Sequence, residues 1–171
     1  MGPADALAIV GGLTDQGVDV VLSGGWAVDA LLGEQTREHA DVDLWLPADQ
    51  LPGAFVALAA RGLDRIFPCP GDRPWNFVLH DGGGLRADLH LFEVRPDGDV
   101  HYGSVTAPHR FPAAALAGSG LILGTPVRCE APEWSLRWHT GYPPRATDRH
   151  DVRALCSRFG LPLPEQFPEG A

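Results

Sequence analysis

Two carboxylates separated by one residue constrain the fold of this chain more than any other feature. Asp41 and Asp43 alternate with apolar residues over residues 41–46, which predicts a β-strand with both acids on one face and a core-facing apolar side. Their Cα atoms would lie about 7 Å apart, two strand rises, so the carboxylates would repel each other. A hard divalent cation with oxygen ligands, Mg²⁺ above all, relieves that repulsion. Two solvated carboxylates are the alternative when the pair is considered alone.

A glycine pair precedes the acids. Gly24 and Gly25 follow a short apolar run, residues 18–22, and open a predicted helix. At such a turn, free backbone N–H groups and the helix N-terminus favour an anion. Ser23 adds a hydroxyl, and the planar guanidinium of Arg37 can clamp a phosphate. These residues predict a nucleoside-triphosphate site that matches neither Walker A nor GxGxxG spacing. A simple turn is the alternative.

A third acid lies on a later predicted strand, residues 86–94. Asp88 and His90 share one face of this strand, and Asp88 would join Asp41 and Asp43 if the two strands pair. Three acids around two metal ions suit in-line phosphoryl-type transfer, because the metals neutralise charge on the attacking and leaving oxygens. His90 would contact substrate or serve a structural role.

Charge narrows the range of partners. The 171 residues carry 13 basic and 22 acidic side chains, a formal net charge of −9, and every basic residue is Arg. This charge disfavours nucleic-acid binding and favours a cationic small molecule. Without Lys, a Lys-based phosphate clamp is excluded. No apolar run reaches the ~20 residues of a membrane span and the first residues lack a basic signal-peptide region, so we expect no membrane association and a cytoplasmic location.

Cysteine and histidine usage predicts neither disulfides nor zinc. Cys69, Cys129 and Cys156 are widely spaced and odd in number, which is typical of ordinary buried thiols. The seven histidines include no HxxxH or HExxH spacing.

The predicted elements define an α+β fold of one compact unit. Residues 1–105 would form the catalytic sheet region, and residues 106–171 a mainly helical region that completes the acceptor site. Predicted helices cover residues 5–16, 26–32, 52–62 and 148–159, with another beginning at Pro132. Predicted strands cover residues 18–22, 41–46, 75–80, 86–94 and 100–102, with a hairpin turn at residues 81–84.

Three residues near the last helix complete the candidate set. His139 and Tyr142 precede this helix and would line an acceptor pocket. Asp148, near its start, is expected to cap it.

The segments 24–29 (GGWAVD) and 36–43 (TREHADVD) resemble the signature of small antibiotic nucleotidyltransferases. These are the lincosamide nucleotidyltransferases and aminoglycoside 2″-adenylyltransferases of the polymerase-beta-like nucleotidyltransferase superfamily. Looser similarity continues through residues 87–90, 126–129 and 139–151, so the resemblance spans roughly residues 5–160.

The resemblance implies a five-stranded mixed sheet flanked by helices. It also implies that the glycine turn grips the triphosphate and that Arg37 faces it. Asp41 and Asp43 would be metal ligands, and Asp88 a third ligand or the acceptor of the substrate proton. The wider superfamily has a Gly-Ser order at the turn, whereas here Ser23 precedes the glycines, which leaves its role as a phosphate ligand open.

The activity expected from the resemblance is Mg²⁺-dependent transfer of AMP from ATP to a hydroxyl of an aminoglycoside or a lincosamide. The net charge suits an aminoglycoside, whereas residues 88–90 and 139–151 look nearer to the lincosamide group. A non-catalytic, antitoxin-like member of the fold and a transferase acting on another hydroxylated metabolite are the alternatives. A phosphohydrolase would leave the glycine turn and Arg37 without a role. An exposed face of the last helices would support a homodimer.

Overall fold

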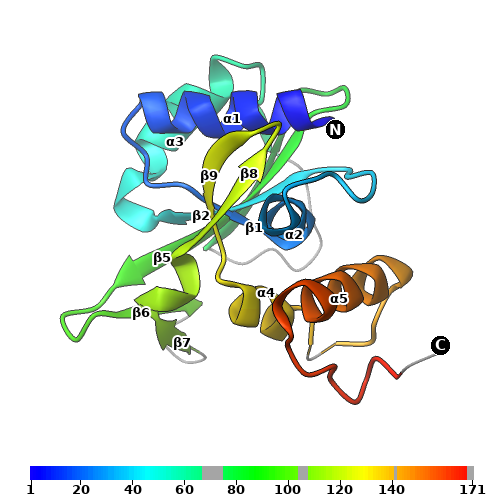
Figure 1. The fold of residues 1–171 in the computed structure, drawn as a ribbon. Coiled ribbons are helices and arrows are strands. Elements are labelled where there is room, and N and C mark those ends of the chain that lie inside the picture. Colours follow the sequence, from blue (N-terminus) through cyan, green and yellow to red (C-terminus); the bar gives the residue numbers. More distant parts are fainter. Residues whose placement is uncertain (67–74, 104–107, 141, 169–171) are drawn as a thin grey trace.

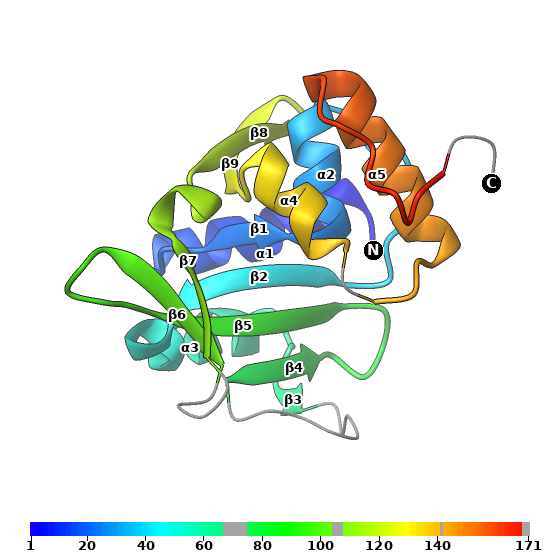
Figure 2. The same ribbon diagram turned by 90° about the horizontal axis from the view of Figure 1, so that it is seen from below.

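A mixed β-sheet forms the centre of the computed structural model, which describes residues 1–66, 75–103, 108–140 and 142–168. The strand order is β3-β4-β5-β2-β1-β9-β8, and β6 pairs with both β5 and β7 (Figures 1 and 2). The pairs β2–β5 and β1–β9 are parallel, and the other pairs are antiparallel. The strands are β1 (Val21–Ser23), β2 (Val42–Pro47), β3 (Arg65–Ile66), β4 (Asn76–His80), β5 (Arg86–Val94), β6 (Asp99–Gly103), β7 (Pro108–Pro112), β8 (Gly118–Ile122) and β9 (Thr125–Cys129).

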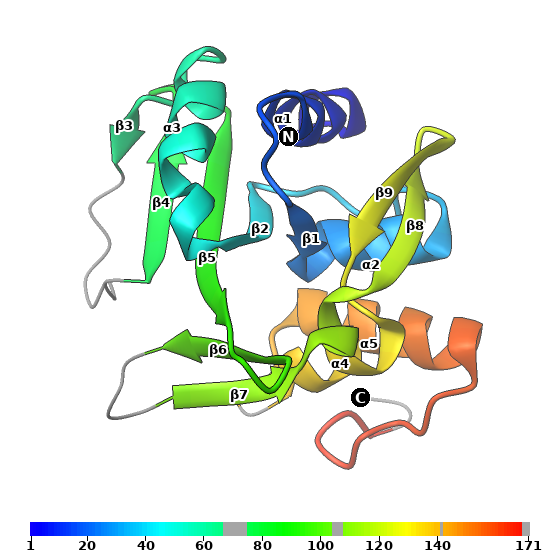
Figure 3. The same ribbon diagram turned by 90° about the vertical axis from the view of Figure 1, so that its left-hand side faces the viewer.

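Helices cover both sides of this sheet. Helices α1 and α3 pack side by side against one face, and α4 and α5 lie on the opposite side (Figures 1 and 3). Helix α2 ends at Leu32 and is capped by Gly33, which adopts the left-handed conformation with φ 82°. The helices are α1 (Pro3–Asp15), α2 (Gly24–Leu32), α3 (Leu51–Ala59), α4 (Pro132–Trp138) and α5 (Ala146–Phe159), with short 3₁₀ turns η1 (Ala48–Gln50) and η2 (Ala113–Leu116).

The alternation along β2 divides the core in two. Val42, Leu44 and Leu46 are fully buried in a cluster with apolar residues of α1, α2 and α3. Trp45 points to the other face and is 5% exposed, within an aromatic cluster that also includes Phe92. Asp43 shares the Trp45 face, so the polar site adjoins buried aromatic rings that hold the strand in place.

Most predicted elements are confirmed. The hairpin of β4 and β5 is present, and β2 pairs in parallel with β5, the arrangement on which the expected position of Asp88 depended. An α+β fold with a mixed sheet is confirmed, but the sheet has nine strands among the described residues rather than five. Cys129 and Cys156 are free thiols, whereas Cys69 lies outside the described residues. No helix in the described ranges is long and apolar enough to cross a membrane.

Four strands are absent from the sequence-based expectation: the two-residue β3, and β7, β8 and β9, which lie in the region from residue 106 that the sequence indicated to be mainly helical. Their composition hides them. Strand β8 reads GSGLI, with two glycines that weaken any strand signal. Both glycines allow close backbone packing. A Cβ at Gly120 would overlap the backbone carbonyl of Ala30 in α2, and a Cβ at Gly118 would overlap the backbone carbonyl of Glu130.

Candidate functional site

The turn between β1 and α2 needs both of its glycines. Gly24 has φ 57°, a conformation that L side chains rarely adopt, and a Cβ there would overlap the Asp43 carboxylate. A Cβ at Gly25 would overlap the guanidinium of Arg37 and the ring of His39. The absence of side chains therefore lets the N-terminus of α2 approach both the acidic strand and the loop before it, where its free N–H groups can meet an anion.

That loop is anchored by Asp29 in α2. The buried Asp29 carboxylate accepts hydrogen bonds from the Thr36 backbone N–H at 3.0 Å and from the Thr36 hydroxyl at 2.7 Å. Its other oxygen lies 2.5 Å from His39 Nε2, and the His39 ring packs against Trp26 with ring centroids 4.3 Å apart and the ring planes tilted by 34°. Asp29 of the segment 24–29 thus holds both Thr36 and His39 of the segment 36–43, and these contacts set the position of Arg37 between them.

Arg37 is held from the far end of the chain. Its Nε and Nη2 donate to the two carboxylate oxygens of Asp151 in α5, at 2.9 and 2.7 Å, and Nη1 lies 3.0 Å from His39 Nδ1. Burial opposes ionisation of Asp151, but hydrogen bonds from Arg37 and His139 hold its pKa down to about 2. Arg37 therefore presents a fixed positive charge at the wall of the pocket. All three of its guanidinium nitrogens already have partners, because Nη1 also donates to the Glu38 carbonyl oxygen at 3.1 Å.

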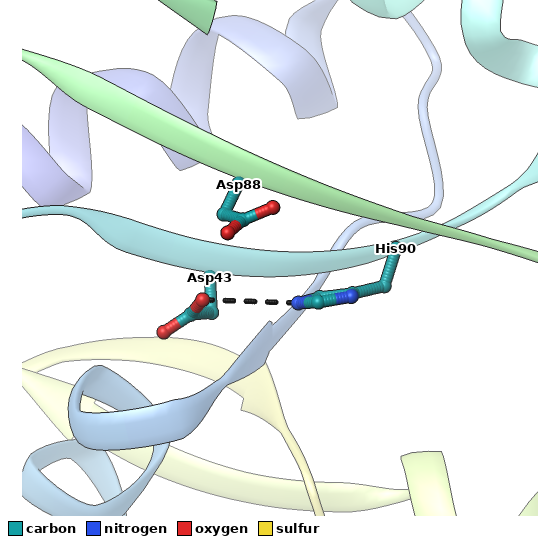
Figure 4. A group of neighbouring side chains, drawn as sticks. All are labelled: Asp43, Asp88 and His90. Atoms are coloured by element: carbon teal, nitrogen blue, oxygen red, sulfur yellow. Dashed lines mark ion pairs between the residues drawn. The ribbon is translucent and has the colours of Figure 1, made fainter. Parts of the chain in front are cut away.

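Two acids and a histidine meet on β2 and β5. The parallel register places Asp43 opposite Asp88, and one ligand atom from each of Asp43, Asp88 and His90 lies within 4.8 Å of the others (Figure 4). His90 Nε2 is 3.7 Å from Asp43 Oδ1, and Asn76 donates to Asp88 Oδ1 at 2.9 Å. Burial, and then the charge of Asp43, raise the pKa of Asp88, although His90 partly offsets this. Carboxylates crowded in this way fit a divalent cation.

Asp41 lies at the edge of this group. Its carboxylate is 3.6 Å from Arg86 Nε, and its side chain is 31% exposed. Burial, followed by the charge of Asp43, raises the pKa of Asp41. In the part of the chain that the structure describes, the close cluster consists of Asp43, Asp88 and His90, with Asp41 lining the same pocket nearby.

The structure brings every predicted site residue to one pocket of about 620 Å³. The predicted residues that line it are Ser23, Gly24, Gly25, Arg37, Asp41, Asp43, Asp88, His90, His139 and Tyr142. These come from β1, α2, the loop between α2 and β2, β2, β5 and the segment between α4 and α5. The loop holds Arg37 and Asp41, so Asp41 lies just before β2 rather than within the strand as predicted.

The C-terminal helices close the pocket. His139 Nδ1 donates to the Ser135 carbonyl at 2.8 Å, and its Nε2 lies 3.5 Å from Asp151. Asp148 helps to cap α5, but from the third helical position, since the helix begins at Ala146 and Asp148 accepts the Arg145 backbone N–H at 2.7 Å. The same carboxylate accepts the Tyr142 hydroxyl at 3.1 Å, which orients that ring beside the pocket.

Glu130 is a site residue that the sequence analysis missed. It follows β9, is 1% exposed, and accepts hydrogen bonds at Oε1 from the Ser23 hydroxyl and from Trp45 Nε1, the latter at 2.7 Å. Burial raises the pKa of Glu130 to about 7, although these hydrogen bonds act in the opposite direction. The sequence around Glu130 gives no sign that this side chain is buried, because β9 itself has no clear strand pattern. Its burial is evident only from the fold. The Ser23 hydroxyl proton is directed to Glu130.

The chain is similar to curated antibiotic-resistance proteins. The chain is 28% identical over 128 residues to a 2″-aminoglycoside nucleotidyltransferase from Escherichia coli, covering 72% of this chain and 64% of that protein, somewhat less than two thirds of its length. It is 26% identical over 137 residues to a lincosamide resistance protein from Staphylococcus haemolyticus, covering 80% of this chain and 83% of that protein.

A solved structure shares the fold. The lincomycin-bound lincosamide antibiotic adenylyltransferase LnuA superimposes with a TM-score of 0.73 at 24% identity, covering 90% of this chain and 92% of LnuA. The family model for aminoglycoside-2″-adenylyltransferase matches residues 5–155, which include the glycine turn, the three acids and most of α5. The resemblance seen in the sequence is thus confirmed, and the chain belongs to the aminoglycoside-2″-adenylyltransferase family.

Proposed function

We propose that the chain is a Mg²⁺-dependent adenylyltransferase that moves AMP from ATP to a hydroxyl group of an aminoglycoside or lincosamide antibiotic and releases pyrophosphate. The observation that carries the proposal is the pairing of Asp43 with Asp88 on parallel strands beside the Gly24-Gly25 turn. Family membership supports the reaction class. The similarity to both an aminoglycoside nucleotidyltransferase and a lincosamide resistance protein keeps both acceptor classes as candidates.

The nucleotide side of the pocket would be the glycine turn. Backbone N–H groups of Gly24 and Gly25, at the start of α2, would bind phosphate oxygens of ATP. Arg37 would add positive charge from a position fixed by Asp151. Ser23 would also belong to the nucleotide-binding turn, and its hydroxyl, which donates to Glu130, would fix the conformation of that turn.

The metal side would be the acids. Asp41, Asp43 and Asp88 are the residues proposed to hold two Mg²⁺ ions, and the close approach of Asp43 and Asp88 fits a divalent cation. Bound Mg²⁺ stabilises the charge that develops on the attacking and leaving oxygens.

The acceptor side would lie between β5 and the C-terminal helices. His90, His139 and Tyr142 would contact the antibiotic there. Asp88 would take the proton of the attacking hydroxyl at Oδ2, while Asn76 holds Oδ1 and orients the carboxylate. The raised pKa of Asp88 suits a group that must accept a proton.

Mass spectrometry tests the proposal. Purified protein is incubated with ATP, Mg²⁺ and a panel of aminoglycosides and lincosamides, and one compound is expected to gain the mass of one AMP unit. Asp43→Asn should reduce the rate by at least about a hundredfold, because several kcal/mol of charge stabilisation depend on the metal. Asp49→Asn, at an exposed position on η1, is the matched control and should retain the wild-type rate. ATP binding without any product would favour the non-catalytic alternative.

A cytoplasmic location and a homodimer through the exposed face of the last helices also stay predictions. Light scattering after size-exclusion chromatography would distinguish a mass near 18.3 kDa from twice that value.

A further inference from the structure

We propose that His90 is a direct ligand of the divalent cation, so that the ion is held by a mixed set of two carboxylates and one imidazole nitrogen. This inference rests on one part of the proposed function, namely that a divalent cation binds at Asp43 and Asp88. It adds His90 to the carboxylate ligands of the proposed function, at the ion that lies between Asp43 and Asp88.

Position is the first argument. His90 and Asp88 project from the same face of β5, and Asp43 lies opposite Asp88 on β2. The three ligand atoms lie within 4.8 Å of one another, and Figure 4 shows the His90 ring directed at the Asp43 carboxylate. A small movement of each side chain would place these atoms around one ion. Asp41 lies beside this group of three, with its carboxylate 3.6 Å from Arg86 Nε.

The orientation of the ring is the second argument. His90 Nδ1 is 3.1 Å from the Tyr102 hydroxyl, which leaves Nε2 as the nitrogen facing the acids. The ring packs on Trp45, with centroids 5.0 Å apart, and meets Tyr102 edge to face. Metal-binding histidines are commonly oriented by a hydrogen bond at the second ring nitrogen, and metal-binding carboxylates are themselves hydrogen-bonded. Asn76 supplies such a bond to Asp88.

A nitrogen ligand changes the preference for metals. Mg²⁺ favours oxygen ligands, whereas imidazole suits later divalent ions such as Co²⁺. The chain should therefore bind Co²⁺ more tightly than Mg²⁺, and most of the difference should depend on His90.

Two binding measurements on the whole protein test this inference without reference to catalysis. Electron spin echo spectroscopy of the Mn²⁺-loaded protein should show coupling to ¹⁴N, and His90→Gln should abolish it. Calorimetric titration should show that His90→Gln weakens Co²⁺ binding about tenfold or more. His90→Asp restores an oxygen ligand, so it should keep Mg²⁺ affinity while lowering the ratio of Co²⁺ to Mg²⁺ affinity.

His101→Gln is the matched control. His101 lies on the neighbouring strand β6, and its Nε2 is 3.2 Å from the Gly103 carbonyl oxygen, so its removal should change neither the ¹⁴N signal nor the affinities. Circular dichroism checks that each variant is folded. Absence of ¹⁴N coupling in wild type, or equal Co²⁺ affinities for wild type and His90→Gln, would overturn the inference. If AMP transfer is observed alongside either result, the proposed function stands and only the role of His90 fails.

Discussion

At the scale of single residues, Glu130 makes the stability of the fold depend on pH. Its carboxyl group has a pKa of about 7 in the folded chain against a usual value of 4.5, so the folded state holds a proton that the unfolded state releases between these values. The free energy of unfolding should therefore fall as pH rises from about 4.5 to about 7, by at most about 3 kcal/mol.

Glu130→Gln should remove this dependence. The amide keeps an oxygen that can accept from Ser23 and Trp45 but does not titrate. Chemical denaturation at pH 5 and pH 8 should show the variant gaining stability relative to wild type at the higher pH. Glu133→Gln, at an exposed position on α4, should follow the wild-type curve. Parallel curves for wild type and Glu130→Gln would mean that Glu130 is not a buried, titrating acid.

At the scale of elements, the turn between β1 and α2 depends on the absence of a side chain at Gly25. Gly25→Ala would place a Cβ against the guanidinium of Arg37 and the His39 ring, which is itself held by Asp29. We expect a loss of about 1–3 kcal/mol in unfolding free energy together with weaker ATP binding. Denaturation and calorimetry measure the two effects.

Gly11→Ala provides the comparison for that change. A Cβ at Gly11 would meet nothing within 4 Å, and the position lies within α1. The substitution should leave ATP binding unchanged and stabilise the fold by about 0.4–1 kcal/mol. If the two variants behave alike, close packing at Gly25 is not what the turn requires.

The elements also show how far the sequence could predict this molecule. Alternation along β2 and β5 sufficed to assign Asp43 and Asp88 each to one face of its strand, because strand periodicity is a local property. The pairing of the two strands, which brings the acids together, was only a condition in the sequence analysis and is given by the structure. Glycine-rich β8 gave no such signal, since its packing against α2 is a contact between distant segments. Glu130 was missed for the same reason: its burial depends on Ser23 and Trp45, more than 80 residues away in the sequence.

At the level of the molecule as a whole, the ion pair of Arg37 with Asp151 joins the N-terminal part of the chain to α5 at the pocket. Arg37 and Asp151 are 114 residues apart, and Asp151 is 1% exposed while Arg37 is partly exposed. Because the pKa of Asp151 is about 2 against a usual 3.8, its contribution is fully present above pH 4 and is lost as pH falls from about 4 to about 2.

Asp151→Asn should therefore affect both stability and nucleotide binding. Removing one partner of a largely buried pair costs about 3 kcal/mol, and a released Arg37 should bind ATP less tightly. Denaturation at pH 7 and calorimetry with ATP measure these effects, with Asp97→Asn as the control. Asp97 pairs with Arg110 at 2.8 Å, but both side chains are exposed, so its loss should cost at most about 1 kcal/mol. If Asp151→Asn weakened stability but left ATP affinity intact, α5 would support the fold without positioning Arg37 for the nucleotide.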